Sequence, residues 1–168
     1  MHAEPPQLSP KMPSKQNLPR IDRRYAHFKL SIRRSPIERW GVFAEEAIPA
    51  GKKVIQYTGE RITHREATRR AVKLIKSGKP GRIYGVYINS WSCLDGAAGS
   101  GAQYINHSCD PNLTVKRAGE QFLLYSFRRI RPGEELTMDY GFKCSCPCQC
   151  GSANCRGTMC RVRAQRAR

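Results

Sequence analysis

Tyr104-Ile105-Asn106-His107-Ser108-Cys109-Asp110-Pro111-Asn112 is the segment on which the architecture of this chain depends. It places Asn, His and Ser side chains in succession directly after two apolar residues, an unusual density of hydrogen-bonding groups. Such a run suits a ligand-binding site. It also suits a structural histidine, satisfied inside the protein, beside a small buried cysteine. The neighbouring segments have to decide between these interpretations.

Two further segments carry chemistry-bearing residues. Upstream, Arg39-Trp40-Gly41-Val42-Phe43-Ala44 has a glycine after the tryptophan, which permits close backbone approach to a ligand. Downstream, Gly133-Glu134-Glu135-Leu136-Thr137-Met138-Asp139-Tyr140-Gly141-Phe142 has the pattern of a strand and runs directly into a cysteine cluster. Each segment alone is compatible with an ordinary strand and turn, so only their combination indicates a functional site.

The remaining pattern predicts a mainly β chain with a few short helices. Short β-branched or aromatic runs bounded by Gly, Pro or Asn indicate strands, and they cover residues 28–32, 54–57, 84–88, 113–116 and 122–127. Residues 118–120 between the last two indicate a hairpin turn. One helix is predicted after Thr63, which forms a capping box with Glu66, and Gly78 and Pro80 end it. One face of that helix is apolar, and we expect its opposite, basic face to be solvated.

Composition indicates one domain with basic tails. The chain has 168 residues, 30 Lys and Arg, 13 Asp and Glu, and a net charge of +17. This charge excludes an acidic protein and favours polyanionic or acidic partners, so we expect non-specific contact with DNA or nucleosomes. Five of the 11 prolines fall before residue 20, and we expect a disordered tail over residues 1–27. Residues 161–168 form a second basic tail.

The cysteines point to metal in a reducing compartment. The N-terminal segment lacks the apolar core of a secretory signal, and no apolar run is long enough for a bilayer. We therefore expect no membrane contact and an intracellular protein, located in the nucleus of a eukaryote or the cytoplasm of a bacterium. Of the 8 cysteines, five crowd into residues 144–155. Such clustering indicates metal binding rather than a disulfide scaffold.

Taken in this order, the segments resemble the SET-domain protein-lysine methyltransferases with a C-terminal post-SET zinc segment. The resemblance rests on residues 40–44, 105–112, 134–140 and 148–157, and covers most of the chain. It implies a fold of small curved β-sheets around a pseudoknot, in which the segment ending at Tyr140 threads under that of Asn106 and His107. The implied organisation is a SET catalytic domain over residues 28–142 and a post-SET zinc segment over residues 143–160.

The resemblance also implies a set of site residues. S-adenosylmethionine would be the methyl donor, Tyr140 the main catalytic tyrosine and Tyr84 the second. The donor-binding residues would be Arg39, Trp40, Gly41, Tyr104, Asn106, His107 and Tyr140. The departures from the family pattern are Gly99-Ser100-Gly101-Ala102-Gln103, where an Asn and an Arg are usual, and Met138, where an aromatic is common.

The cysteines give a separate reason to expect a zinc site. Cys148, Cys150 and Cys155 offer three thiolates, and Cys109 would supply the fourth of a tetrahedral Zn²⁺ site. Cysteine occupies every second position from residue 144 to residue 150, so other pairs of these residues could bind the metal instead. Cys160 is not needed for a four-ligand site.

The function indicated is S-adenosylmethionine-dependent transfer of methyl groups to the side-chain amine of a protein lysine. The substrate would be a histone tail or another basic protein, and the enzyme a monomer. The alternative is a catalytically dead SET-like zinc module that binds chromatin or nucleic acid. A dead module would tend to lose one of the residues Asn106, His107, Tyr140 and Tyr84. All four are present, which favours the enzyme.

Overall fold

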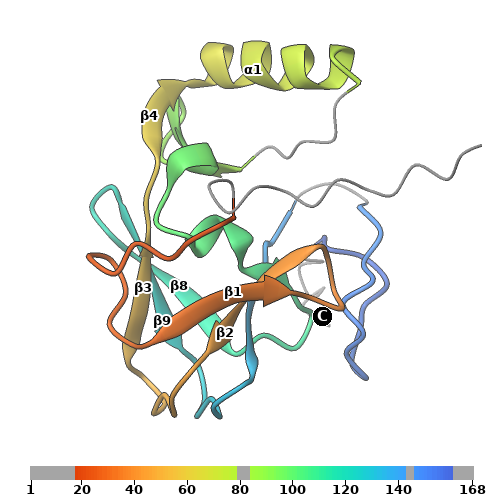
Figure 1. The fold of residues 1–168 in the computed structure, drawn as a ribbon. Helices are drawn as coiled ribbons and strands as arrows, with labels where there is room; N and C mark the ends of the chain where they lie inside the picture. The colour runs from red at the N-terminus through yellow and green to blue at the C-terminus, as the bar shows by residue number, and fades with distance from the viewer. Residues whose placement is uncertain (1–17, 79–83, 143–145, 161–168) are drawn as a thin grey trace, which may run out of the picture.

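The computed structural model describes residues 18–78, 84–142 and 146–160. The expected mainly β architecture is confirmed (Figure 1). Its strands are β1 (Leu30–Arg34), β2 (Trp40–Ala44), β3 (Lys53–Tyr57), β4 (Glu60–Thr63), β5 (Gly85–Tyr87), β6 (Ser92–Asp95), β7 (Asn106–His107), β8 (Leu113–Ala118), β9 (Gln121–Ser126) and β10 (Glu135–Met138). Its helices are α1 (His64–Lys76) and the short 3₁₀ turns η2 (Gly96–Ala98) and η3 (Ala102–Tyr104).

The larger sheet curls around the core. Its strand order is β1-β2-β10-β8-β9-β3, with β7 also paired to β10. The expected hairpin is confirmed, because β8 and β9 pair antiparallel across a turn in which Gly119 has a φ of 58°. Apolar side chains of these strands form one buried cluster that includes Val42, Ile55, Leu124 and Leu136. Burial of such side chains is the main stabilising contribution to the fold.

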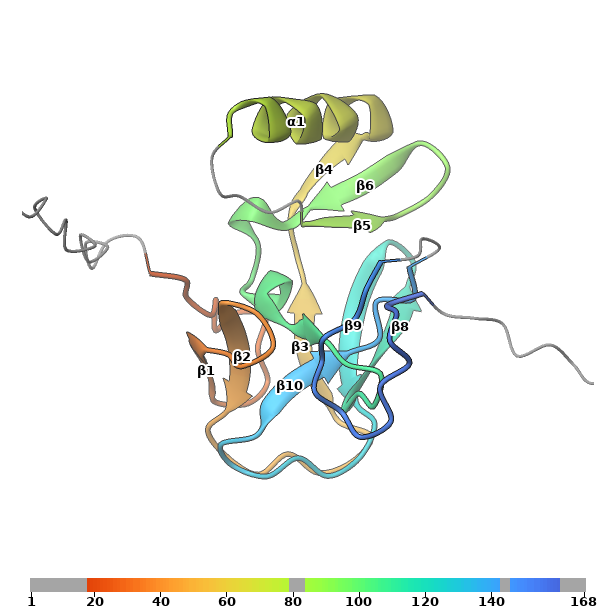
Figure 2. The same ribbon diagram turned by 90° about the vertical axis from the view of Figure 1, so that its right-hand side faces the viewer.

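Strand β10 joins segments that are distant in the sequence. It pairs antiparallel with β2 and parallel with both β7 and β8 (Figure 2). Asn112 fastens this arrangement with both ends of its side-chain amide. Its Nδ2 donates to the Glu135 carbonyl at 2.7 Å and to Glu134 Oε1 at 3.0 Å, and its Oδ1 accepts from the Thr137 N–H at 2.9 Å. The residues before Tyr140 therefore lie against the segment that holds Asn106 and His107.

The second sheet carries the helix. Strands β4, β6 and β5 form it in that order, and α1 lies over it, away from the larger sheet (Figure 2). Thr63 caps α1 as expected, since its Oγ1 accepts from the Glu66 N–H at 3.2 Å. The Glu66 carboxylate, however, binds Arg69 and Arg70 within the helix.

An arginine ties α1 to its sheet. Nη1 of Arg70 lies 2.7 Å from carboxylate oxygens of both Glu60 on β4 and Asp95 on β6. None of residues 64–76, all of which the structure describes, is buried. Of the four residues on the apolar face of the helix, Ala67, Ala71 and Leu74 are partly buried and Ile75 is 72% exposed. The ion pairs of Arg70 therefore add to the partial burial of this face in holding the helix on the sheet.

Part of the predicted N-terminal tail is not a tail. The Asp22 N–H donates to the Ser100 carbonyl, and the backbones of Tyr25 and His27 bond to β3 at 2.9–3.0 Å. Ile21 and Ala26 pack against the core. The proline content placed the end of the tail too late in the sequence. Residues 21–27 are held instead by these two apolar side chains and by backbone hydrogen bonds to β3. Residues 1–17 and 161–168 lie outside the described residues. Within the described ranges, no helix is long and apolar enough to cross a membrane.

Replacement of Asn112 by alanine should destabilise the protein. Asn112 is 2% exposed, so the variant leaves the Thr137 N–H buried without its partner. The expected loss is about 2 kcal/mol in the free energy of unfolding, measured by urea denaturation. Gln121→Ala at the exposed start of β9 is the control, with a change below about 0.5 kcal/mol. Equal effects of the two substitutions would contradict the role given to Asn112.

Candidate functional site

The loop between β1 and β2 forms one wall of the candidate site. Arg39 has a φ of 33°, a left-handed conformation that is strained for a residue with a side chain. The Asn106 amide nitrogen reaches this loop, donating to the Trp40 carbonyl at 3.0 Å and to Ser35 Oγ at 3.1 Å. Asn106 is 4% exposed. The structure thus brings Arg39, Trp40 and Asn106 together, as expected from the sequence.

A carboxylate completes this wall. Glu135 on β10 accepts from Asn106 Nδ2 at 2.8 Å and from Ser35 Oγ at 2.8 Å. A Cβ at Gly41 would lie 2.2 Å from Glu135 Oε1, so any larger residue there would require the Glu135 carboxylate to move.

Tyr140 lies shortly after β10, and two hydrogen bonds hold it in place. Its hydroxyl donates to the Ile105 carbonyl at 2.9 Å, and its backbone N–H donates to His107 Nδ1 at 3.1 Å. Its ring also lies against the rings of His107 and Phe142, with centroids 5.3 and 5.1 Å away. These contacts leave the phenol little freedom to rotate, which suits a residue that orients a reacting group.

Other tyrosines lie close by. Tyr84 and Tyr104 meet edge to face, with ring centroids 5.7 Å apart. Tyr57 at the end of β3 donates its hydroxyl to the Tyr84 carbonyl at 3.3 Å. Burial raises the pKa of Tyr57, and the neighbouring Tyr140 raises it further. Its phenol is therefore neutral at physiological pH, and the cluster offers aromatic walls with hydroxyl groups.

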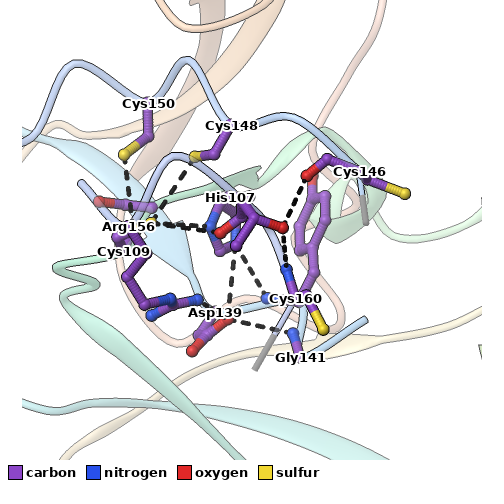
Figure 3. Close-up of polar contacts among 12 residues, drawn as sticks. His107, Cys109, Asp139, Gly141, Cys146, Cys148, Cys150, Arg156 and Cys160 are labelled. Carbon is purple, nitrogen blue, oxygen red and sulfur yellow. Dashed lines mark hydrogen bonds and ion pairs between the residues drawn. The ribbon is translucent and has the colours of Figure 1, made fainter. Parts of the chain in front are cut away.

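His107 is hydrogen-bonded to Tyr140, and Cys109 lies next to Cys148 of the C-terminal segment (Figure 3). His107 is 3% exposed, and this burial lowers the pKa of its imidazole. Its Nε2 lies 3.5 Å from Cys109 Sγ. His107 is thus buried with partners at both nitrogens, as expected of a structural histidine, whereas Cys109 faces further cysteines rather than an apolar core.

Four sulfur atoms converge beyond Cys109. The Sγ atoms of Cys109, Cys148, Cys150 and Cys155 all lie within 4.8 Å of one another. A tetrahedral zinc–thiolate site needs sulfurs about 3.8 Å apart, and Cys109 and Cys148 are 3.7 Å apart. This set therefore fits Zn²⁺. Cys144 lies outside the described residues.

The surroundings of Cys150 favour the thiolate form of its side chain. Burial works to raise the pKa of Cys150, but hydrogen bonds from the backbone N–H groups of Cys109 and Ser152 and from neighbouring cysteine thiols together lower it to about 6. The Cys109 N–H lies 3.5 Å from the Cys150 sulfur. A thiolate is the form that binds a metal, so the backbone here favours ligation.

An ion pair joins the C-terminal segment to the end of β10. Arg156 Nη2 lies 3.1 Å from Asp139 Oδ1, which also accepts from the Gly141 N–H (Figure 3). Burial works to raise the pKa of Asp139, but these partners hold it below its usual value. The residues around Tyr140 are thereby tied to the cysteine-bearing segment on two sides.

Four residues of the site went unnoticed in the sequence. Ser35, Tyr57, Glu135 and Arg156 have no local signal, because each acts through a partner far along the chain. Ser35 and Glu135 are 100 residues apart. The nearest available hint was the neighbouring pair Glu134 and Glu135 in a chain poor in acidic residues.

Three relatives and one solved structure resemble this chain. The histone-lysine N-methyltransferase, H3 lysine-4 specific, of Emericella nidulans is 38% identical over 75% of this chain and 11% of that protein. Its namesake in Saccharomyces cerevisiae is 37% identical over 75% of this chain and 13% of that protein. Histone-lysine N-methyltransferase SETD1B of Homo sapiens is 37% identical over 78% of this chain and 7% of that protein. The chain thus spans a small part of the length of these relatives.

The fold agrees with these relatives. A solved structure, from work on the structural basis for the product specificity of histone lysine methyltransferases, matches with a TM-score of 0.68 and 30% identity. The match covers 80% of this chain and 57% of that one. The family model named SET domain matches residues 39–141, which include Trp40, Asn106 and Tyr140. Because this match takes in more than half of the chain, the chain belongs to the SET-domain family.

Proposed function

We propose that this chain is an S-adenosylmethionine-dependent histone-lysine N-methyltransferase. Residues 28–142, with residues 21–27 packed against them, would form its catalytic unit, and residues 143–160 a zinc-binding post-SET segment. The observation that carries the proposal is the placement of Tyr140. Its hydroxyl and its N–H are both held beside Asn106 and His107, at the end of the strand that joins the signature segments.

The protein residues divide into two roles. The backbone of Arg39, Trp40 and Gly41, together with Asn106 and His107, would bind the donor, with Tyr104 and Tyr140 beside it. When bound, the donor supplies an electrophilic methyl group on a positively charged sulfur.

The tyrosines would prepare the lysine. A free lysine has a pKa of about 10.4, so only about one in a thousand is neutral at pH 7 and able to attack. A channel walled by Tyr140 and Tyr84 excludes water and disfavours the ammonium form. Their hydroxyl groups orient the amine. Tyr140 acts by positioning rather than as a base, since the ordinary pKa of a phenol is near 10.

Histone H3 is the substrate to test first. Two of the relatives are named as specific for lysine 4 of H3, and SETD1B as a histone-lysine methyltransferase. We extend this substrate to the present chain, together with a nuclear location on chromatin. Three basic residues of α1 are exposed and suited to contact DNA, namely Arg65, Lys73 and Lys76. A monomeric state remains a prediction.

The experiment is methylation of recombinant nucleosomes and of an H3 tail peptide with a labelled donor, followed by mass spectrometry. Incorporation into H3 at lysine 4 supports the proposal. Incorporation only into another protein would overturn the substrate. Donor binding without transfer to any protein in a cell extract would favour the alternative, a catalytically dead module on chromatin.

Tyr140→Phe should reduce kcat about 100-fold, the usual cost of one positioned hydrogen-bond donor in an active site. The substitution removes only the hydroxyl, so the ring contacts with His107 and Phe142 persist. Donor affinity, measured by calorimetry, should be nearly unchanged. Tyr125→Phe on β9 is the matched control and should retain full turnover. A fully active Tyr140→Phe enzyme would remove Tyr140 from the mechanism.

One tightly bound zinc per chain is expected in the purified protein. Cys109→Ser and Cys150→Ser should each release it, because a tetrahedral site loses one of its four ligands. Metal content is read by mass spectrometry of the native protein. Cys93→Ala, at a buried cysteine of β6, should retain the metal. Retention in Cys109→Ser would show that the site closes with a different ligand.

The enzyme should add more than one methyl group to its substrate lysine. Met138 occupies the position two residues before Tyr140, and it lacks a hydroxyl that could restrain the amine. It also packs against the core. Mass spectrometry at long reaction time should show dimethyl-lysine, and Met138→Tyr should lower its share. A strictly monomethyl product that is unchanged in Met138→Tyr would assign the limit to another wall.

A further inference from the structure

We infer that His107 is a positioning residue that links the zinc site to the catalytic tyrosine through the two nitrogens of one imidazole ring. Nδ1 accepts the backbone N–H of Tyr140, and the Nε2–H donates to the sulfur of Cys109. This inference rests on the zinc site and the role of Tyr140 proposed above. It assigns to the His107 side chain a task other than contact with the donor.

The geometry places both partners in range. The Tyr140 nitrogen lies 3.1 Å from Nδ1, a normal length for an N–H donor. Cys109 Sγ lies 3.5 Å from Nε2, which is suitable for a bond to sulfur. The ring is enclosed, with a side-chain exposure of 2%. Figure 3 shows it between Cys109 on one side and the Asp139–Gly141 backbone on the other.

These contacts define the tautomer. Because the Tyr140 N–H points at Nδ1, that nitrogen has to carry a lone pair, and the single proton of the neutral ring lies on Nε2. The opposite tautomer would direct its proton from Nδ1 to Asp139, 3.6 Å away, and would oppose the Tyr140 N–H. Asp139 already accepts from Gly141 and pairs with Arg156. The Nε2–H therefore faces the Cys109 sulfur.

A donor at this sulfur has a physical use. A zinc-bound thiolate carries excess negative charge, and an N–H bond to it both reduces that charge and orients the ligand. Partners of this kind alter metal affinity by about 10- to 100-fold in other metal sites. The same ring holds the Tyr140 backbone, so occupancy of the metal site and the position of the tyrosine are coupled through His107.

Two substitutions separate the two bonds. Asparagine at this position can keep an acceptor near Nδ1 but has no atom near Nε2. Glutamine can keep a donor near Nε2 but has no acceptor near Nδ1. The experiment uses the full zinc-loaded chain and compares His107→Asn, His107→Gln and, as control, the exposed His27→Asn. Zinc release to a chromogenic chelator is timed, and hydrogen exchange of the Tyr140 amide is followed by NMR.

His107→Asn should shorten the half-time of zinc release about 10-fold and leave the Tyr140 amide protected. His107→Gln should keep the wild-type half-time and lose that protection by about 10-fold or more. Should both variants change both readouts equally, or should neither change any, the link is wrong and His107 is merely a packed residue.

A measurement without mutation decides the case even if the variants do not fold. Nitrogen-15 NMR of the wild-type imidazole should show a bare Nδ1 and a protonated Nε2; the reverse tautomer, or a wild-type chain that binds no zinc, would overturn the inference. A zinc-loaded wild-type chain with this tautomer that methylates no histone would overturn the proposed function and leave the His107 link standing.

Discussion

The side-chain amide of Asn112 ties β10 to the segment that begins at Ile105, and the candidate site depends on this cross-link. Two hydrogen bonds from one buried side chain hold the backbone of Glu135 and Thr137 in register, and a third reaches the Glu134 carboxylate. That register makes β10 a parallel neighbour of β7. As a result Tyr140 leaves the strand beside His107, and Cys109 emerges on the side where the C-terminal cysteines lie.

The few carboxylates of this basic chain serve its internal organisation. Glu135 binds Ser35 and Asn106, and Asp139 binds Arg156. Glu134 accepts from Asn112; burial works to raise the pKa of Glu134, but its hydrogen bonds, including that from Arg128, hold it below its usual value. Because the central acids already have partners inside the fold, the surplus of Lys and Arg is available to solvent and to acidic or polyanionic molecules.

Local patterns were the part of the structure that the sequence predicted well. The Thr63 cap, the turn at Gly119 and the hairpin strands β8 and β9 depend on residues within a few positions of each other, and all of them are confirmed. The predictions that were wrong concern contacts across the fold. Residues 21–27 pack against β3 although their composition suggested a tail, and Ile75 is exposed although it belongs to the apolar face of α1.

The sequence by itself determined the family, through motifs whose residue types and order are visible without coordinates, and it supplied the residues of the site. Only the tertiary structure decided their partners. Among the described cysteines it brings four sulfurs together, and it directs the Asn106 amide to Glu135 and Nδ1 of His107 to Tyr140. The physical reason is separation along the chain. A helix cap or a turn depends on nearest neighbours, whereas contacts between residues 29 to 100 positions apart exist only after β10 has been placed.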